Sequence, residues 1–439
     1  MAVEAVQPVE AVQTIEAPPA EKVQALETLG EDFVQRQAHY LRRFRGEGPV
    51  HEVIFPHGAK VWLVTRYADC KALALDPRVG KDGRRLNEMY AKHSTLSSPM
   101  HSTTAEEEEA EPGFDDDLAA HVLNSDPPNH TRLRKLAIKA VTPARQEALR
   151  PGVEVAVEKL LDRLAEAPVV DLLAEFAWPL PLGTICDLFA MPEEDRENFR
   201  KWSGTLTGAG QDPAEVASAS KNMTEYANSL IDARRANPGD DMISEMLRMD
   251  LDGDQLTQGE IVGMIFIIVT AGHVTTVHSI GNGVFNLLTH PEELEKLRAD
   301  PSLIPAAVDE LMRYDPAASV GTFRFTKAEI EINGVTIPKD QILALSWGSA
   351  NRDETKFADP DRLDVTRCPQ GTFSFGHGVH YCIGIPMAKM QIEIALERLL
   401  ARYPHLRLAV PAEDVRWTSS ALLHGLAGLP VSVFPPDEA

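Results

Sequence analysis

Apolar and polar residues alternate along this chain in a way that predicts helices, with short strands in two regions. Val61–Thr65 is rich in β-branched residues and predicts a strand, whereas Tyr67–Leu75 repeats its apolar positions at helical spacing. Several helices separated by prolines are expected between residues 153 and 249. Thr257–Leu288 is apolar nearly all round at its centre, which predicts a long buried helix. Short strands with a turn at Asn333-Gly334 are expected after residue 316.

Two segments lack such a pattern. Residues 1–30 are rich in Ala, Glu, Val and Pro and predict a disordered leader. Residues 79–122 have no clear period and contain an acidic run, Glu106–Asp117. An unstructured loop of this length inside a compact domain is expected to be functional or mobile. A solvated acidic loop without a binding role is an equally open interpretation of the acidic run.

Length and charge set broad limits. At 439 residues the chain could hold two or three domains by length alone, and its formal net charge of −23 argues against nucleic acid as a partner. The four cysteines are not closely spaced, so we expect a reducing compartment without disulfides. The N-terminus lacks the features of a signal peptide, and the longest apolar run, Ile261–Ala271, is too short to span a bilayer. We therefore expect a cytoplasmic protein without a membrane anchor.

The strongest candidate for chemistry is Cys382, in the sequence FGHGVHYCIG. Glycines at positions 376, 378 and 384 permit positive φ angles and close backbone approach, and a helical run follows at once. The start of a helix favours thiolate over thiol, and a thiolate is a metal ligand or a nucleophile. A buried structural cysteine in a glycine-rich turn is the alternative.

Three further patterns have both a structural and a functional interpretation. His130 and Arg134 lie four residues apart and share a helix face, which is more often simply solvated. Glu310 and Arg313 form an i, i+3 pair, and exposed pairs of this type contribute little stability. Small residues at 271 and 272 in the long helix would admit a ligand or, alternatively, a close helix contact.

The pattern F-G-x-G-x-H-x-C-x-G resembles the heme-thiolate loop of the cytochrome P450 superfamily at every fixed position, and the block DPPNHTRLR resembles a second conserved region of its soluble bacterial (actinobacterial-type) members. The resemblance implies a cytochrome P450 fold, mainly α with a smaller β-rich part (α+β), in a single domain covering residues 31–439. It also implies heme b (iron protoporphyrin IX) as cofactor, with Cys382 as the iron ligand. The interval 79–122 would lie near the distal pocket.

The same resemblance assigns roles to individual residues. Heme contacts are expected from His130, Arg134, Arg324, His380, Phe375, Gly376 and Gly384. A buried network supporting the cysteine loop is expected from Glu310, Arg313 and Arg362. Oxygen activation is assigned to Thr275 with Ala271, Gly272 and Thr276, and the substrate pocket to Val274, Ile267, Ala318, Val320, Ala421 and Leu422.

One position departs from the family pattern. The acidic residue that usually precedes the threonine, and supports proton delivery with it, is Val274 here. Three substitutes are open: Thr275 with ordered water, a polar group of the substrate, or His273. The last is the least favoured, because His273 should project about 100° away on the helix.

The resemblance implies a monooxygenase that hydroxylates or epoxidises a specialised metabolite such as a polyketide, macrolide, terpenoid or peptide. It would use O₂ and electrons from NAD(P)H through a separate ferredoxin and ferredoxin reductase. Oxidative cross-linking of aromatic groups, for example on a peptide, is a second hypothesis that Val274 motivates. A non-catalytic heme protein that binds a small ligand is a third.

Overall fold

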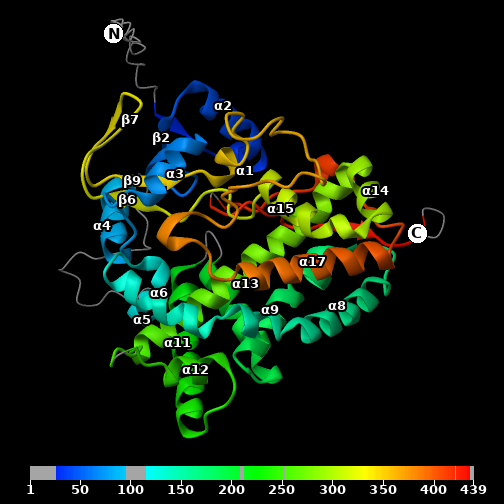
Figure 1. Ribbon diagram of the computed structural model, residues 1–439, viewed down its shortest axis with the longest axis horizontal. Helices are drawn as coiled ribbons and strands as arrows, with labels where there is room; N and C mark the ends of the chain where they lie inside the picture. Colours follow the sequence, from blue (N-terminus) through cyan, green and yellow to red (C-terminus); the bar gives the residue numbers. More distant parts are fainter. Residues whose placement is uncertain (1–25, 95–114, 208–211, 252, 421, 436–439) are drawn as a thin grey trace, which may run out of the picture.

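The protein is described by a computed structural model covering residues 26–94, 115–207, 212–251, 253–420 and 422–435, in which a helical part packs beside a smaller sheet region (Figure 1). The larger sheet has the strand order β1-β2-β3-β9-β6-β4 and a smaller sheet has the order β10-β11-β5, with β7 and β8 forming a hairpin. The strands are β1 (Glu27–Thr28), β2 (Val50–Ile54), β3 (Lys60–Val64), β4 (Val79–Gly80), β5 (Val170–Asp171), β6 (Arg324–Thr326), β7 (Ile330–Ile332), β8 (Val335–Ile337), β9 (Ile342–Leu345), β10 (Arg407–Leu408) and β11 (Pro430–Ser432).

Helices form most of the described structure, as the resemblance implied. They are α1 (Glu31–Gln35), α2 (Gln37–Glu47), α3 (Tyr67–Leu75), α4 (Gly83–His93), α5 (Asp116–Ala119), α6 (Asn129–Ala140), α7 (Pro143–Glu147), α8 (Arg150–Leu164), α9 (Pro179–Leu188), α10 (Arg196–Thr207), α11 (Pro213–Ala236), α12 (Met242–Arg248), α13 (Gln258–Thr289), α14 (Pro291–Ala299), α15 (Ile304–Tyr314), α16 (Trp347–Ala350) and α17 (Ile385–Arg402).

Helix α13 is the centre of the helical part. Thr257 caps it, and the Glu260 side chain accepts a hydrogen bond from the Thr257 backbone, which completes a capping box. Its apolar residues pack against α5, α9, α15 and α17, and Figure 1 shows it running through the helical part beside α17. By length and composition α13 could cross a bilayer, but 72% of its most apolar window is buried inside the protein. The prediction of a long buried helix is therefore confirmed.

The hairpin turn predicted at Asn333-Gly334 is confirmed. Asn333 and Gly334 have φ angles of 47° and 83°, and Ile332 pairs with Val335 across the turn. Both central residues of a tight two-residue turn need positive φ, which asparagine and glycine tolerate best.

Two expectations of irregular structure were wrong. Residues 27–30 were assigned to the leader, but Glu27–Thr28 pairs with β2 and Leu29 is buried, so the domain begins before residue 31. The interval 79–122 contains β4, α4 and α5, while most of its acidic run lies outside the described residues. Helix α4 was missed because its apolar residues are few, and Met89 is its one fully buried side chain.

Candidate active site

The loop before α17 holds Cys382 through backbone geometry. Gly376 and Gly378 adopt φ angles of 72° and 77°, in the left-handed region that favours glycine. A side chain at Gly378 would also meet the carbonyl oxygen of Ala74 at 2.7 Å. The Cys382 backbone N–H donates to the carbonyl of Phe375 over 3.1 Å, which closes the loop. The glycine-rich pattern therefore has a steric cause.

The Cys382 thiol lies at the start of a helix. Its sulfur accepts a hydrogen bond from the backbone N–H of Gly384, 3.3 Å away at the start of the 18-residue helix α17. The pKa of the Cys382 thiol is raised overall, because burial outweighs this hydrogen bond and the Arg134 guanidinium, both of which lower it. Cys382 is an exposed residue, although burial of its thiol disfavours the charged form. A buried structural cysteine would not be accessible in this way.

Four predicted heme contacts gather next to this loop. The rings of His130 and His380 lie 4.2 Å apart, and Arg134 donates a hydrogen bond to the carbonyl of Tyr381. Arg324, in β6, is buried, and burial lowers the pKa of its guanidinium to about 10. Burial, followed by the charges of Lys81, His130, Arg324 and Arg134, lowers the pKa of the His380 imidazole.

These residues fit an anionic cofactor. Both ring nitrogens of His130 and Nε of Arg324 are buried without a hydrogen-bond partner in the described residues. Unpaired buried donors carry a free-energy cost that an acceptor would relieve. A ligand with two carboxylates, as heme b has, would supply acceptors to this group beside the loop that contains Cys382. The residues present therefore fit the cofactor that the resemblance implied.

The sequence analysis missed a further cation in this group, Lys81. Strand β4 pairs with β6 so that Gly80 lies opposite Phe325, which brings Lys81 next to Arg324. The Lys81 side chain is buried and its ammonium donates to the Thr322 hydroxyl over 2.5 Å. No local sequence pattern indicates this, because the burial arises from pairing between strands far apart in the chain.

One face of α13 is open in the middle of an otherwise buried helix. Ile267 and Thr275 are partly exposed and Ala271 is exposed, and a spacing of four residues places all three on one face. The Thr275 hydroxyl donates to the carbonyl of Ala271 over 2.5 Å, which leaves its oxygen free to accept a hydrogen bond. Gly272 is partly exposed beside this face. This is the arrangement expected of a helix that borders a ligand.

Three neighbouring residues of α13 are buried, although Val274, seven residues after Ile267, lies on the same face of the helix as the open residues. Thr276 and Val274 are 2% and 7% exposed, and the Thr276 hydroxyl donates to the carbonyl of Gly272. His273 packs edge-on against Trp178, with 4.9 Å between the ring centres, and burial lowers the pKa of its imidazole to about 4. A buried neutral imidazole on another face of the helix is poorly placed to replace an acid beside Thr275. This placement agrees with the prediction that His273 is the least favoured of the three substitutes for the missing acid.

The expected pocket residues from the C-terminal part come together. The Val320 backbone N–H donates to the carbonyl of Leu422 over 3.1 Å, and Ala318 forms a bridge with Leu423. Ala421 lies outside the described residues. His424 anchors this segment, since its imidazole lies 3.2 Å from the Asp315 carboxylate and its carbonyl accepts from Asn282 of α13.

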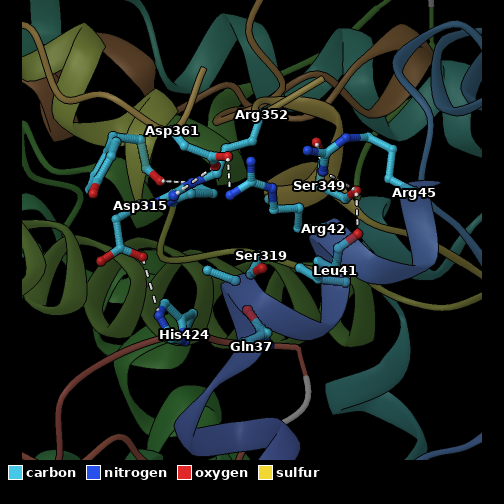
Figure 2. Close-up of a pocket in the computed structure, with 14 residues that line it drawn as sticks. Gln37, Leu41, Arg42, Arg45, Asp315, Ser319, Ser349, Arg352, Asp361 and His424 are labelled. Atoms are coloured by element: carbon cyan, nitrogen blue, oxygen red, sulfur yellow. Dashed lines mark hydrogen bonds and ion pairs between the residues drawn. The ribbon is translucent and has the colours of Figure 1, made fainter. Parts of the chain in front are cut away.

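Figure 2 shows a pocket that His424 helps to line, together with Arg42, Arg352 and Asp361. It shares no lining residue with the cysteine loop. We therefore place the candidate active site between the loop and α13, and not in this pocket.

The expected support network is buried, but one of its members was wrongly predicted. Arg313 donates two hydrogen bonds to Glu310, at 2.7 and 2.9 Å, and both side chains are fully buried. The third arginine is Arg367, whose Nε lies 3.1 Å from the Glu310 carboxylate. The side chain of Arg362 is 62% exposed and faces Asp364, and only its backbone carbonyl joins the network. The segment between the two arginines turns so that Arg367 points inward.

Comparison with known proteins agrees with this site. The family model described as Cytochrome P450 matches residues 209–421. The chain is 43% identical to Cytochrome P450 107B1 of Saccharopolyspora erythraea, over 91% of this chain and 95% of that protein. It is 39% identical to 6-deoxyerythronolide B hydroxylase of the same organism, over 88% of this chain and 93% of that protein.

Among solved structures, the tirandamycin C-bound P450 monooxygenase TamI superposes with a TM-score of 0.83 at 39% identity, covering 93% of this chain and all of that one. These identities extend over nearly the whole of both chains. The chain belongs to the cytochrome P450 family, whose members are monooxygenases that bind heme b through a cysteine thiolate.

Proposed function

We propose that this protein hydroxylates or epoxidises a polyketide or macrolide scaffold, with Cys382 as the ligand of the heme iron. The observation that carries the proposal is the open face of α13, where Ile267, Ala271 and Thr275 offer apolar surface and one hydroxyl. Apolar pockets with few polar groups suit large, weakly polar ligands. Relatives of this chain include a hydroxylase named for 6-deoxyerythronolide B and a monooxygenase solved with tirandamycin C.

The side chains have distinct tasks in this proposal. When bound, heme activates O₂ with electrons and protons so that one oxygen atom enters the substrate and the other leaves as water. His130, Arg134, Arg324 and His380 would hold its carboxylates by charge-assisted hydrogen bonds. The Thr275 oxygen would accept a hydrogen bond from a water molecule and so orient it for proton delivery, since Val274 cannot carry a proton.

We place the electron-donor surface over the cysteine loop. Four exposed apolar side chains belong to this region: Leu75, Ile138, Val379 and Tyr381. Leu75 would touch a side chain at Gly378, and Arg134, one turn before Ile138, bonds the loop at Tyr381. The exposed lysine Lys71 adds positive charge to α3, and the exposed lysines Lys135 and Lys139 add positive charge to α6. An apolar centre with a basic rim fits an acidic ferredoxin.

One basic residue of α6 does not belong to that rim. Arg132 pairs with Asp254 and Glu260 at 2.6 and 2.7 Å, so its charge is compensated within the protein. The positive charge that α6 offers to a partner therefore depends mainly on Lys135 and Lys139.

The proposed substrate class is tested by optical titration of the heme-loaded protein with macrolactones, other polyketides, terpenoids and cyclic peptides, followed by turnover with a ferredoxin and its reductase. We expect a high-spin shift and a product one oxygen atom heavier with macrolactones or related polyketides. Turnover confined to terpenoids or peptides would contradict the substrate class while leaving the monooxygenase assignment intact.

Replacement of Thr275 by alanine is expected to uncouple electron consumption from product formation. A positioned proton-transfer group typically contributes about 10²–10⁴-fold, and water can replace part of it here, so we expect about tenfold less product per NAD(P)H oxidised. Thr289→Ala is the matched control, because Thr289 makes the same bond to the carbonyl four residues earlier, at the end of α13. Equal coupling in both variants would remove Thr275 from the mechanism.

The two alternative functions are less well supported. The relatives described above are hydroxylases and monooxygenases, which argues against a non-catalytic heme protein. Oxidative cross-linking was motivated by the absence of an acid at Val274, and that absence alone does not distinguish coupling from oxygen insertion. No feature of the described residues favours coupling over oxygen insertion.

A further inference from the structure

Lys81 is a buried cation whose charge the described protein does not balance. Its side chain is buried, and burial together with Arg324 lowers the pKa of its ammonium well below the ordinary value. Asp126 is the one carboxylate that acts on both Lys81 and Arg324 within the described residues. Buried cations are costly unless an anion pairs with them.

Asp126 is itself shared. One of its oxygens accepts the backbone N–H of Lys81 at 2.9 Å, and the other lies 3.2 Å from the ammonium of Lys327. The Asp126 carboxylate therefore accepts a hydrogen bond from the backbone of Lys81. Among the described residues, the Lys81 ammonium itself donates to the neutral hydroxyl of Thr322. Since Arg324 Nε and both nitrogens of His130 also lack partners in the part of the chain that the structure describes, this region contains more donors than acceptors there.

We propose that Lys81 is an additional heme-positioning residue, whose ammonium pairs with a carboxylate of the bound cofactor and ties it to Thr322. This rests on the heme site proposed above. Thr322 is exposed and follows the segment that contains Ala318 and Val320, so the bond Lys81–Thr322 would connect the cofactor carboxylates to a wall of the expected substrate pocket.

The test compares Lys81→Met and Lys81→Gln with Lys327→Met. Lys327 is a matched control, since it also lies beside Asp126 but its side chain is 39% exposed. In the heme-loaded protein we expect both neutral Lys81 variants to lose heme to an excess of apomyoglobin about tenfold faster, the equivalent of one charge-assisted hydrogen bond. Their reduction potential should also fall, because removing a nearby positive charge favours the ferric state. The Lys327 variant should match the wild type in both measurements.

Two further measurements separate this role from a structural one. Without heme, the neutral Lys81 variants should resist urea at least as well as the wild type, because an uncompensated buried charge has been removed. With heme dimethyl ester, whose carboxyl groups carry no charge, wild type and Lys81→Met should lose cofactor at equal rates.

Three results would overturn the proposal. The first is that the Lys81 variants lose heme at the same rate as Lys327→Met. The second is that neither neutral Lys81 variant folds without heme. The third is that wild type and Lys81→Met still lose the esterified cofactor at different rates. A wild-type protein that binds no heme would instead contradict the proposed site as a whole, which is a distinguishable outcome.

Discussion

Replacement of Cys382 by serine is expected to abolish turnover and the optical signature of thiolate ligation. Cys382 is an exposed residue whose sulfur accepts a hydrogen bond from the Gly384 N–H at the start of α17, and the Arg134 guanidinium favours its anionic form. A serine hydroxyl has a far higher pKa than a thiol and cannot supply the same anionic ligand at neutral pH. We expect the reduced protein under carbon monoxide to lose its strongly red-shifted Soret band, and product formation to fall to background.

Cys368→Ser is the control for this variant. Cys368 is the other accessible cysteine of the described chain and lies in the segment before the loop, outside the hydrogen bonds that close it. We expect it to keep the shifted band and wild-type turnover. If Cys382→Ser retained the shifted band, another residue would have to be the ligand.

The largest effect on stability is expected at Arg313. Its guanidinium pairs with Glu310, and both side chains are fully buried. It also donates to the carbonyls of Asn351 and Pro360, which fixes the segment that leads to the cysteine loop. Arg313→Met leaves the Glu310 carboxylate buried with reduced compensation, which typically costs about 3–5 kcal/mol. Urea unfolding, followed by circular dichroism and by heme absorbance, should show this loss in the free energy of unfolding.

Two neighbouring variants test which arginine completes this network. Arg367→Met removes a bond to Glu310 and three bonds to backbone carbonyls, so we expect a loss of about 1–3 kcal/mol. Arg362→Met removes an exposed charge near Asp364 and should change stability by less than about 0.5 kcal/mol. The reverse order would contradict the structure and restore Arg362 as the buried member.

The parts of the fold that depend on local pattern could be predicted from the sequence. Tyr67–Leu75 forms α3 with the predicted bounds, and α13 begins one residue after the predicted start, Thr257, which caps it. The glycines of the cysteine loop also indicated its geometry, because closely spaced glycines are typical of a backbone with positive φ angles. Gly376 and Gly378 adopt such angles. Patterns of this kind record constraints between residues close together in the chain.

Features that depend on pairing between distant segments could not be predicted in this way. The burial of Lys81 follows from the pairing of β4 with β6, a strand more than 240 residues further along the chain. The amino-acid sequence around Lys81 resembles that of an exposed loop. The choice between Arg362 and Arg367 depends on how a turn directs two side chains five residues apart. Both errors concern long basic side chains, whose direction a one-dimensional pattern does not encode.

The central claim is that the site formed by the cysteine loop and α13 inserts one oxygen atom into its substrate. The most direct measurement is the mass of the product formed from a bound macrolactone under ¹⁸O₂, with ferredoxin and its reductase supplying electrons. We predict a product heavier than the substrate by one ¹⁸O atom, with the label absent when ¹⁶O₂ and labelled water are used instead. A product lighter by two hydrogen atoms and free of label would contradict the account, and would identify oxidative coupling as the reaction.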